Sequence, residues 1–341
     1  MKPRTLLVFS VGIAKVALAF AAASSTFTEQ SQAPGENTQL QTTANPGSLE
    51  LRIAQETALI RDGEQHGLEP LKMGRLWAHL GIDYEDALEF AKAEAAYNHS
   101  LRILKASPAG TADYANVLDN LGSMYLRVGN LAEAERCSRN SLVVREKMGD
   151  KLQIARGKWH LADVELSEHR ASEAKEEALE AYKEMTALKD PQTSDLVSAL
   201  ITLVYAECSY DRCMDGVAHA KWSLALARGA TPSEDPIMTG QALLALGFAE
   251  WKSRTKDAPE EEMQESIEIF KSQKSRGRTY VLMAMEQYRN YLAAMGRSSD
   301  AKQVASEETL LKQQQSASCL NCTVSVYSLE EERAIQSRSQ K

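Results

Sequence analysis

The chain has 341 residues, a net charge of −8 at pH 7, and 43% apolar but only 6% aromatic residues. This acidic balance argues against a nucleic-acid-binding protein, because binding to phosphate groups requires a basic surface. The apolar residues are mainly alanine and leucine, as stacked helices require.

The first 23 residues have the pattern of a secretory signal peptide. Basic Lys2 and Arg4 precede an apolar stretch, and the small residues of "ALAFAAA", from residue 17 to 23, resemble a signal-peptidase site. We therefore expect an exported protein, periplasmic, secreted or associated with the cell envelope, from which residues 1–23 are cleaved. The alternative is an uncleaved anchor, the only case in which we expect membrane contact. Lys15 argues against an anchor, because inserting a lysine at the centre of a membrane-spanning helix costs about 2.5–3.5 kcal/mol.

Residues 24–47 are rich in Ser, Thr, Gln, Asn and Pro, and this composition predicts a disordered linker. A first helix is expected from Ser48 to His66, where apolar residues form one stripe. Such a helix would cover the open end of the structure that follows it.

Beyond this helix, one short pattern recurs along the chain. The stretches "LWAHLGIDY", from residue 76, and "LDNLGSMY", from residue 118, share a Leu-Gly pair followed three residues later by Tyr. In further copies the small position holds Ala162, Ala206 and Gly247, and a last copy has Arg289 there. The small position thus recurs at residues 81, 122, 162, 206, 247 and 289, in steps of 41, 40, 44, 41 and 42 residues. A period this regular indicates stacked helical hairpins.

Three glycines lie inside the predicted first helices, although glycine there costs about 1 kcal/mol relative to alanine. We expect Gly81, Gly122 and Gly247 to let the second helix of the hairpin approach closely. The residue of the second helix that faces this small residue is expected twelve positions later in the sequence. This spacing predicts small residues packed between the two helices at Ala93, Ala134, Ala174 and Ala218.

Turn signals separate the two helices of several hairpins. Gly129 and Gly296 are expected to end first helices in the left-handed conformation. Asn130 and Glu133 resemble a capping box for the next helix. Around Pro259, the stretch "KSRTKDAPE" predicts a longer loop between the helices.

These residues resemble the tetratricopeptide pattern, W-x2-L-G-x2-Y followed by alanine and an aromatic residue. The copy that matches it best consists of Trp77, Leu80, Gly81, Tyr84, Ala93 and Tyr97. The period exceeds the common repeat of about 34 residues and is similar to that of kinesin light chain repeats. The resemblance implies an all-α, right-handed solenoid of stacked helix-turn-helix hairpins over residues 48–315. HEAT or armadillo units, about 40–47 residues long, are the alternative.

The resemblance also implies a concave groove, lined by the first helices, that binds protein or peptide segments. The family's inward-facing positions correspond here to Asn116, Asp119, Asn120, Ser123, Arg127, Arg156, Trp159, His160 and Asp163. We expect Asn120 to hydrogen-bond a peptide backbone, since its amide both donates and accepts. Arg127 and Arg156 could hold an acidic side chain, and Trp159 would be an aromatic anchor. Alternatively, Asn120 bridges helices and Trp159 belongs to the core.

Five cysteines cannot all pair within one chain. Cys319 and Cys322 form a C-x-x-C in the flexible tail expected at residues 316–341. This motif could be a redox centre, half of a metal site or a small disulfide. A metal site needs about four ligands, and no second pair with matching spacing is present. We therefore expect a surface pair that oxidises on export, and no metal.

The sequence contains no constellation typical of an enzyme. Its six histidines are scattered without a pair four residues apart, and there is no Gly-rich phosphate loop, nucleophile elbow or H-E-x-x-H motif. We therefore predict an exported, non-catalytic scaffold or adaptor with a protein or peptide partner and no cofactor. The alternatives are a redox or metal accessory protein that uses the C-x-x-C, and a membrane-anchored assembly factor.

Overall fold

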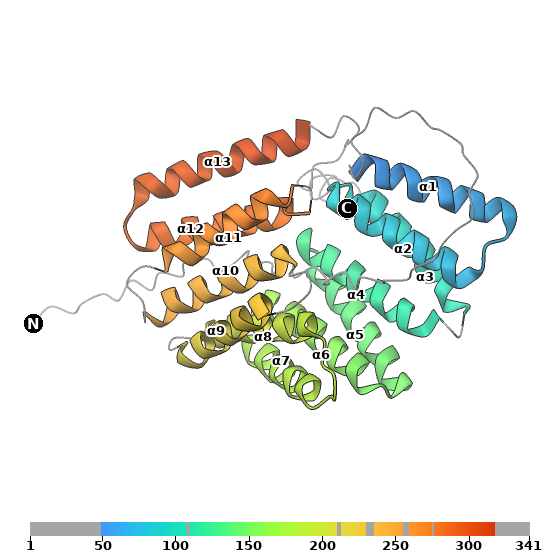
Figure 1. The fold of residues 1–341 in the computed structure, drawn as a ribbon, viewed down its shortest axis with the longest axis horizontal. Helices are drawn as coiled ribbons and strands as arrows, with labels where there is room; N and C mark the ends of the chain where they lie inside the picture. The colour runs from blue at the N-terminus through green and yellow to red at the C-terminus, as the bar shows by residue number, and fades with distance from the viewer. Residues whose placement is uncertain are drawn as a thin grey trace, which may run out of the picture.

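The computed structural model describes residues 49–107, 110–209, 213–229, 235–254, 259–274 and 276–317. Within these ranges it contains thirteen α-helices and no strand, which confirms the predicted all-α fold (Figure 1). The helices are α1 (Leu49–His66), α2 (Pro70–Asp86), α3 (Phe90–Lys105), α4 (Thr111–Arg127), α5 (Leu131–Met148), α6 (Lys151–Ser167), α7 (Ala171–Thr186), α8 (Thr193–Glu207), α9 (Met214–Gly229), α10 (Pro236–Ser253), α11 (Glu260–Ser272), α12 (Arg278–Ala294) and α13 (Ser298–Ala317).

Three predicted segments fall partly or wholly outside the described residues. The signal peptide (1–23) and the linker (24–47) lie outside them entirely, as do Cys319 and Cys322 of the tail. The helices that are described begin at Leu49 and end at Ala317, close to the range of 48–315 predicted for the solenoid.

The helices form a curved stack of two layers. Each helix packs on the next along the chain, and the even-numbered helices from α2 to α12 also contact one another in order. The stack bends so far that its last helices return towards its first (Figure 1). Across this gap the Arg127 guanidinium of α4 donates a hydrogen bond of 2.5 Å to the Thr279 hydroxyl of α12. The even-numbered helices therefore form the inner layer of a nearly closed ring.

The small residues predicted between paired helices are found in three of four hairpins. Ala93, Ala134 and Ala174 have no exposed surface, but Ala218 is exposed, so this part of the prediction is wrong. Helix α8 ends only one residue after Ala206, which changes the register of α9. Gly216 is buried there instead, two residues before the expected position.

A disulfide joins the same hairpin. Cys208 at the end of α8 and Cys213 before α9 are bonded, with their Cα atoms 4.6 Å apart. Both are buried, and a Cβ on Gly216 would lie 2.5 Å from the Cys208 sulfur. This pair was not predicted from the sequence, although two cysteines that flank a hairpin turn and precede a glycine indicate such a disulfide. Cys137 is buried and free.

The turns within hairpins share one backbone conformation. Gly129 and Gly296 both have φ of +76°, which confirms the predicted left-handed position. Leu88 and His169 occupy the equivalent place in two other hairpins, with φ of +61° and +63°. The turn geometry thus belongs to the repeat, and glycine is the residue that adopts it with least strain.

The capping box predicted at the start of α5 is wrong in one part. Asn130 is the N-cap residue, but its side chain makes no capping hydrogen bond. Its backbone N–H donates instead to the Tyr125 carbonyl at 2.8 Å and closes the preceding helix. Glu133 does lie in the first turn of α5, where it pairs with Arg136. The longer loop predicted near Pro259 is confirmed, since α10 ends at residue 253 and α11 begins at 260.

Candidate functional site

The inner layer surrounds a cavity of about 590 Å³. Side chains from all six even-numbered helices, α2 to α12, line it. Ligand pockets in proteins measure about 300–1,000 Å³, so the space suits a small molecule or a short stretch of polypeptide. The curvature of the stack thus brings residues from every hairpin to one site.

Most of the predicted groove residues lie on this wall. Those that line the cavity are Asn116, Asp119, Asn120, Ser123, Arg127, Arg156, Trp159 and His160. Asp163 does not, because it is buried under α8, where the Thr202 hydroxyl donates a hydrogen bond of 2.5 Å to its carboxyl group. The binding role of these residues stays a prediction, but their shared location follows from the repeat.

Trp159 is a core residue and not an exposed anchor. Only 3% of its surface is exposed, and its indole N–H donates a hydrogen bond of 3.0 Å to the Thr202 hydroxyl of α8. The indole thereby links α6 to α8 beneath the cavity wall. The structure therefore agrees with the alternative prediction for Trp159, which placed it in the core.

Several neutral polar side chains on the wall have no hydrogen-bond partner among the described residues, among them Asn120, Ser123 and Gln241. Asn120 and Ser123 lie on α4, and Gln241 lies on α10. Asn120 is half-buried, and it does not bridge neighbouring helices. These side chains are therefore available to a ligand.

The charged side chains on the wall are already paired. Six carboxylates line the cavity, and each lies within 2.5 to 3.2 Å of a different arginine. The pairs are Glu85–Arg127, Asp86–Arg52, Asp113–Arg75, Asp119–Arg145, Asp195–Arg156 and Asp235–Arg276. Arg127 and Arg156, expected to hold an acidic side chain of a partner, thus hold carboxylates of the chain itself.

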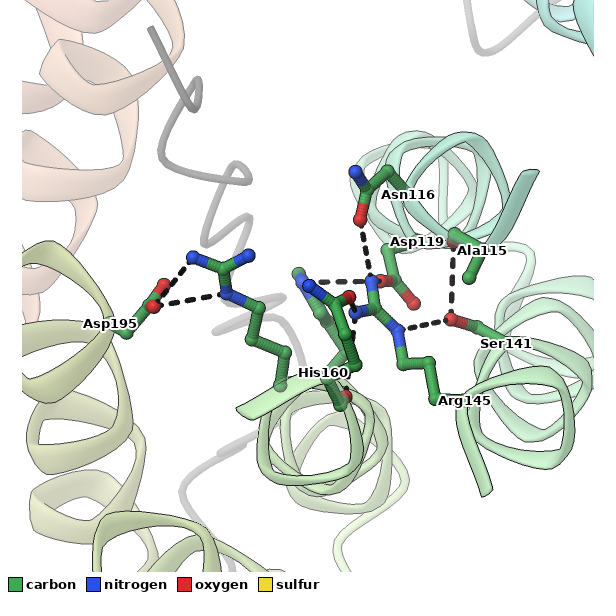
Figure 2. Close-up of polar contacts among 9 residues, drawn as sticks. Ala115, Asn116, Asp119, Ser141, Arg145, His160 and Asp195 are labelled. Carbon is green, nitrogen blue, oxygen red and sulfur yellow. Dashed lines mark hydrogen bonds and ion pairs between the residues drawn. The ribbon is translucent and has the colours of Figure 1, made fainter. Parts of the chain in front are cut away.

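Arg145 reaches the cavity from the outer layer (Figure 2). It is 1% exposed and lies on α5, at a position that other hairpins fill with apolar residues. The equivalent residues are Leu104, Met185, Ala227 and Phe270. Its guanidinium donates to Asp119 at 2.5 Å and to the Asn116 side-chain oxygen at 2.8 Å.

The remaining donors of Arg145 are also occupied. They reach the Ser141 hydroxyl at 3.1 Å and both the backbone and the side-chain oxygen of Gln153. Because a guanidinium has five N–H donors, none is left for a ligand. Arg145 instead fixes the Asn116 amide by its oxygen, which leaves the amide nitrogen free for other contacts.

His160 lies next to this network, its Nε2 3.6 Å from Asp119. Burial lowers the pKa of its imidazole, and the nearby Arg145 adds to this effect, while Asp119 opposes it. His79, on the same wall, also has a lowered pKa, mainly through burial. Both imidazoles are therefore neutral at pH 7 and add no charge to the cavity.

Replacing Asp163 with asparagine is expected to stabilise the protein at pH 7. Burial raises the pKa of this carboxyl well above its ordinary value. The folded state must therefore hold a proton that the unfolded state has released, and stability falls as the pH rises above the unfolded pKa of about 3.9. Urea unfolding at pH 7 and at pH 4 or below would measure this. The gain should disappear at the lower pH, and a gain that is equal at both would contradict the burial argument.

Comparison with known proteins agrees with the class that this geometry defines, an α-solenoid with an inner ligand-sized cavity. Residues 72–147 match the family model of the tetratricopeptide repeat. Residues 72–147 therefore belong to the tetratricopeptide repeat family, as the sequence pattern predicted for the copies at Gly81 and Gly122. No curated protein matches it by sequence.

Several solved structures share the fold. The apo form of RapI is 12% identical, with a TM-score of 0.62, and the match covers 79% of this chain and 93% of that one. The Rap conjugation gene regulator of plasmid pLS20, solved with the Phr* peptide, is 12% identical, with a TM-score of 0.63 and coverage of 81% and 73%. BtubC (BKLC) from P. vanneervenii is 18% identical, with a TM-score of 0.52 and coverage of 66% and 92%. At these identities the likeness shows the fold alone.

The described residues contain neither a membrane-spanning helix nor a cluster of metal-binding side chains. None of their helices combines the length and hydropathy needed to cross a membrane. They also contain no group of three or more His, Cys, Asp or Glu side chains placed to hold a metal ion.

Proposed function

We propose that this chain is a non-catalytic scaffold or adaptor that binds a peptide, or an extended segment of a protein, in its inner cavity. The observation that carries the proposal is the set of unpartnered neutral groups on the wall. Asn120 can donate to a peptide carbonyl and accept from a peptide N–H. Ser123 lies less than one helical turn further along α4, and the free amide nitrogen of Asn116 lies about one turn before. Together they offer hydrogen bonds along one helix, as an extended backbone requires.

The comparisons support a polypeptide ligand. The pLS20 regulator, which shares the fold, was solved in complex with the Phr* peptide. Tetratricopeptide solenoids also present extended concave surfaces, which are used for binding. In this chain the concave surface is the wall of the cavity.

Binding would be tested with a library of random hexapeptides, each acetylated and amidated. Peptides retained by the purified protein in size-exclusion chromatography would be identified by mass spectrometry, and the best one titrated. Asn120→Ala is expected to weaken its affinity at least about tenfold, equivalent to about 1.4 kcal/mol. Asn140, exposed on the outer helix α5, provides the matched control Asn140→Ala. Both variants must keep wild-type helicity. Loss of affinity in the control but not in Asn120→Ala would place binding outside the cavity.

Trp159→Ala is not a suitable probe of binding. The side chain is buried in the core, and removing such an aromatic residue typically costs about 3–5 kcal/mol of stability. Ser123→Ala is the better second variant, because its hydroxyl lines the cavity without a partner among the described residues.

We also propose that the protein is exported. The sequence pattern of residues 1–23 supports this, and so does the Cys208–Cys213 disulfide, because such bonds persist mainly in oxidising compartments. The mature chain is expected to begin near Phe20 or Ser24, with Cys208 and Cys213 linked. Intact mass and peptide mapping of the protein from its natural host would measure both. An intact Met1 on protein from a soluble cytoplasmic pool would contradict export.

A further inference from the structure

The charges on the cavity wall balance one another, and this limits what the cavity can bind. All six carboxylates are paired with arginines, and the two histidines on the wall are neutral at pH 7. The side chains on the wall that have no hydrogen-bond partner among the described residues are neutral, and they include Asn120, Ser123 and Gln241. Apolar side chains complete it, among them Ile82 and Met238.

Several of the pairs are too buried to exchange partners easily. The Arg127 and Glu85 side chains are 8% and 9% exposed, and those of Arg156 and Asp195 are 15% and 9% exposed. Separating such a pair leaves an uncompensated charge away from water, which is strongly unfavourable. Beside these buried pairs, a charged ligand side chain would therefore meet no free counter-charge, and it would lose its hydration on entry.

We infer that the cavity selects a peptide segment without charged side chains, held through its backbone and through neutral polar and apolar groups. The inference rests on the proposed peptide binding and specifies its ligand. It replaces the expectation that Arg127 and Arg156 would hold an acidic side chain. Specificity arises here from exclusion, because a charged ligand cannot be compensated inside the wall.

Three pools of hexapeptides, all acetylated and amidated, would test this inference. One pool contains only neutral residues, the second contains one lysine per peptide, and the third contains one glutamate. Wild-type protein is expected to retain the neutral pool at least about tenfold over both others, the ratio that corresponds to about 1.4 kcal/mol. The affinity of the best neutral peptide should also stay constant between about 50 and 500 mM NaCl. Attraction between charges is increasingly screened over this range of salt concentration, so binding that depended on charge would weaken.

Two variants should change this preference in opposite directions. Asp195→Asn removes the carboxylate partner of Arg156 and should enrich the glutamate pool, while Arg156→Gln frees Asp195 and should enrich the lysine pool. Asp215→Asn, at an exposed position on α9, changes the net charge in the same way as Asp195→Asn and should keep the neutral preference. Circular dichroism would establish that each variant is folded, and the wild-type comparison decides the inference if either variant is not.

The outcomes separate this inference from the function on which it rests. If wild-type protein prefers either charged pool to the neutral one, the inference is overturned while peptide binding stands. If it retains no pool, the proposed function is overturned and the inference with it. A neutral preference in the wild type, lost in opposite directions in the two variants, supports both.

Discussion

Arg145→Met is expected to destabilise the protein by about 3–5 kcal/mol, the typical cost of leaving one partner of a buried ion pair uncompensated. Arg145 and Asp119 are 1% and 2% exposed, so water cannot replace the lost guanidinium. The effect arises from the unpaired charge of Asp119. It does not arise from the shape of the new side chain, because the next hairpin has methionine at the equivalent position, Met185. Equilibrium unfolding in urea, followed by circular dichroism, would measure it.

The matched control replaces both members of the pair with residues found in other hairpins. Leu203 and Leu244 occupy the position equivalent to Asp119, and both are buried. Because an apolar pair of similar volume often replaces a buried ion pair at no cost, Arg145→Met with Asp119→Leu should recover most of the lost stability. A double variant as unstable as the single one would show that the hydrogen bonds to Asn116 and Gln153 matter more than the charge.

The double variant, Arg145→Met with Asp119→Leu, would separate the effect of this ion pair on stability from its effect on ligand binding. The double variant should remain folded but lose the constraint on Asn116, because Arg145 no longer holds its side-chain oxygen. Burying the charged groups of this network costs desolvation energy, which an apolar pair at the same positions would avoid. We interpret the network as the means by which an outer helix fixes the polar groups of the inner wall.

The sequence predicted those features that lie within one hairpin. Ala93 and Ala134 were placed correctly because a fixed number of residues separates them from the small residue on the helix they face. The same count failed at Ala218, since it assumes a first helix of constant length and α8 is shorter. Eight of the nine predicted groove residues lie on the cavity wall for the same reason, because inward-facing positions recur with the repeat.

Features that depend on neighbouring hairpins could not be predicted in this way. Arg156 and Asp195 come from successive inner helices, and their pairing depends on how the hairpins are rotated against each other. The contact between Arg127 and Thr279, 152 residues apart, depends on rotations summed over the whole stack. The position of Arg145, in contrast, was readable as a charged residue at a position that is apolar in the other hairpins.

Gly81→Ala is expected to cost about 3 kcal/mol, near the upper end for overpacking a core. A Cβ at this position would lie 2.6 Å from two carbons of the Tyr97 ring. The ring cannot easily move aside, because it has no exposed surface and its hydroxyl donates a hydrogen bond of 2.8 Å to Glu85. The same change would therefore also disturb Glu85, the partner of Arg127 on the cavity wall.

Gly122→Ala provides the matched control, since it makes the same change at the equivalent position of the next hairpin. There the nearest atom to an added Cβ is the Ser138 hydroxyl, at 3.2 Å, and serine is much smaller than tyrosine. A slight adjustment would admit the methyl group, and the gain of about 1 kcal/mol in helix propensity should offset its cost. Only a larger change, Gly122→Leu, should cost about 1–3 kcal/mol. Thermal unfolding of the three variants would measure these differences. If alanine has the same effect at both glycines, the size of the facing side chain does not determine the cost of the substitution.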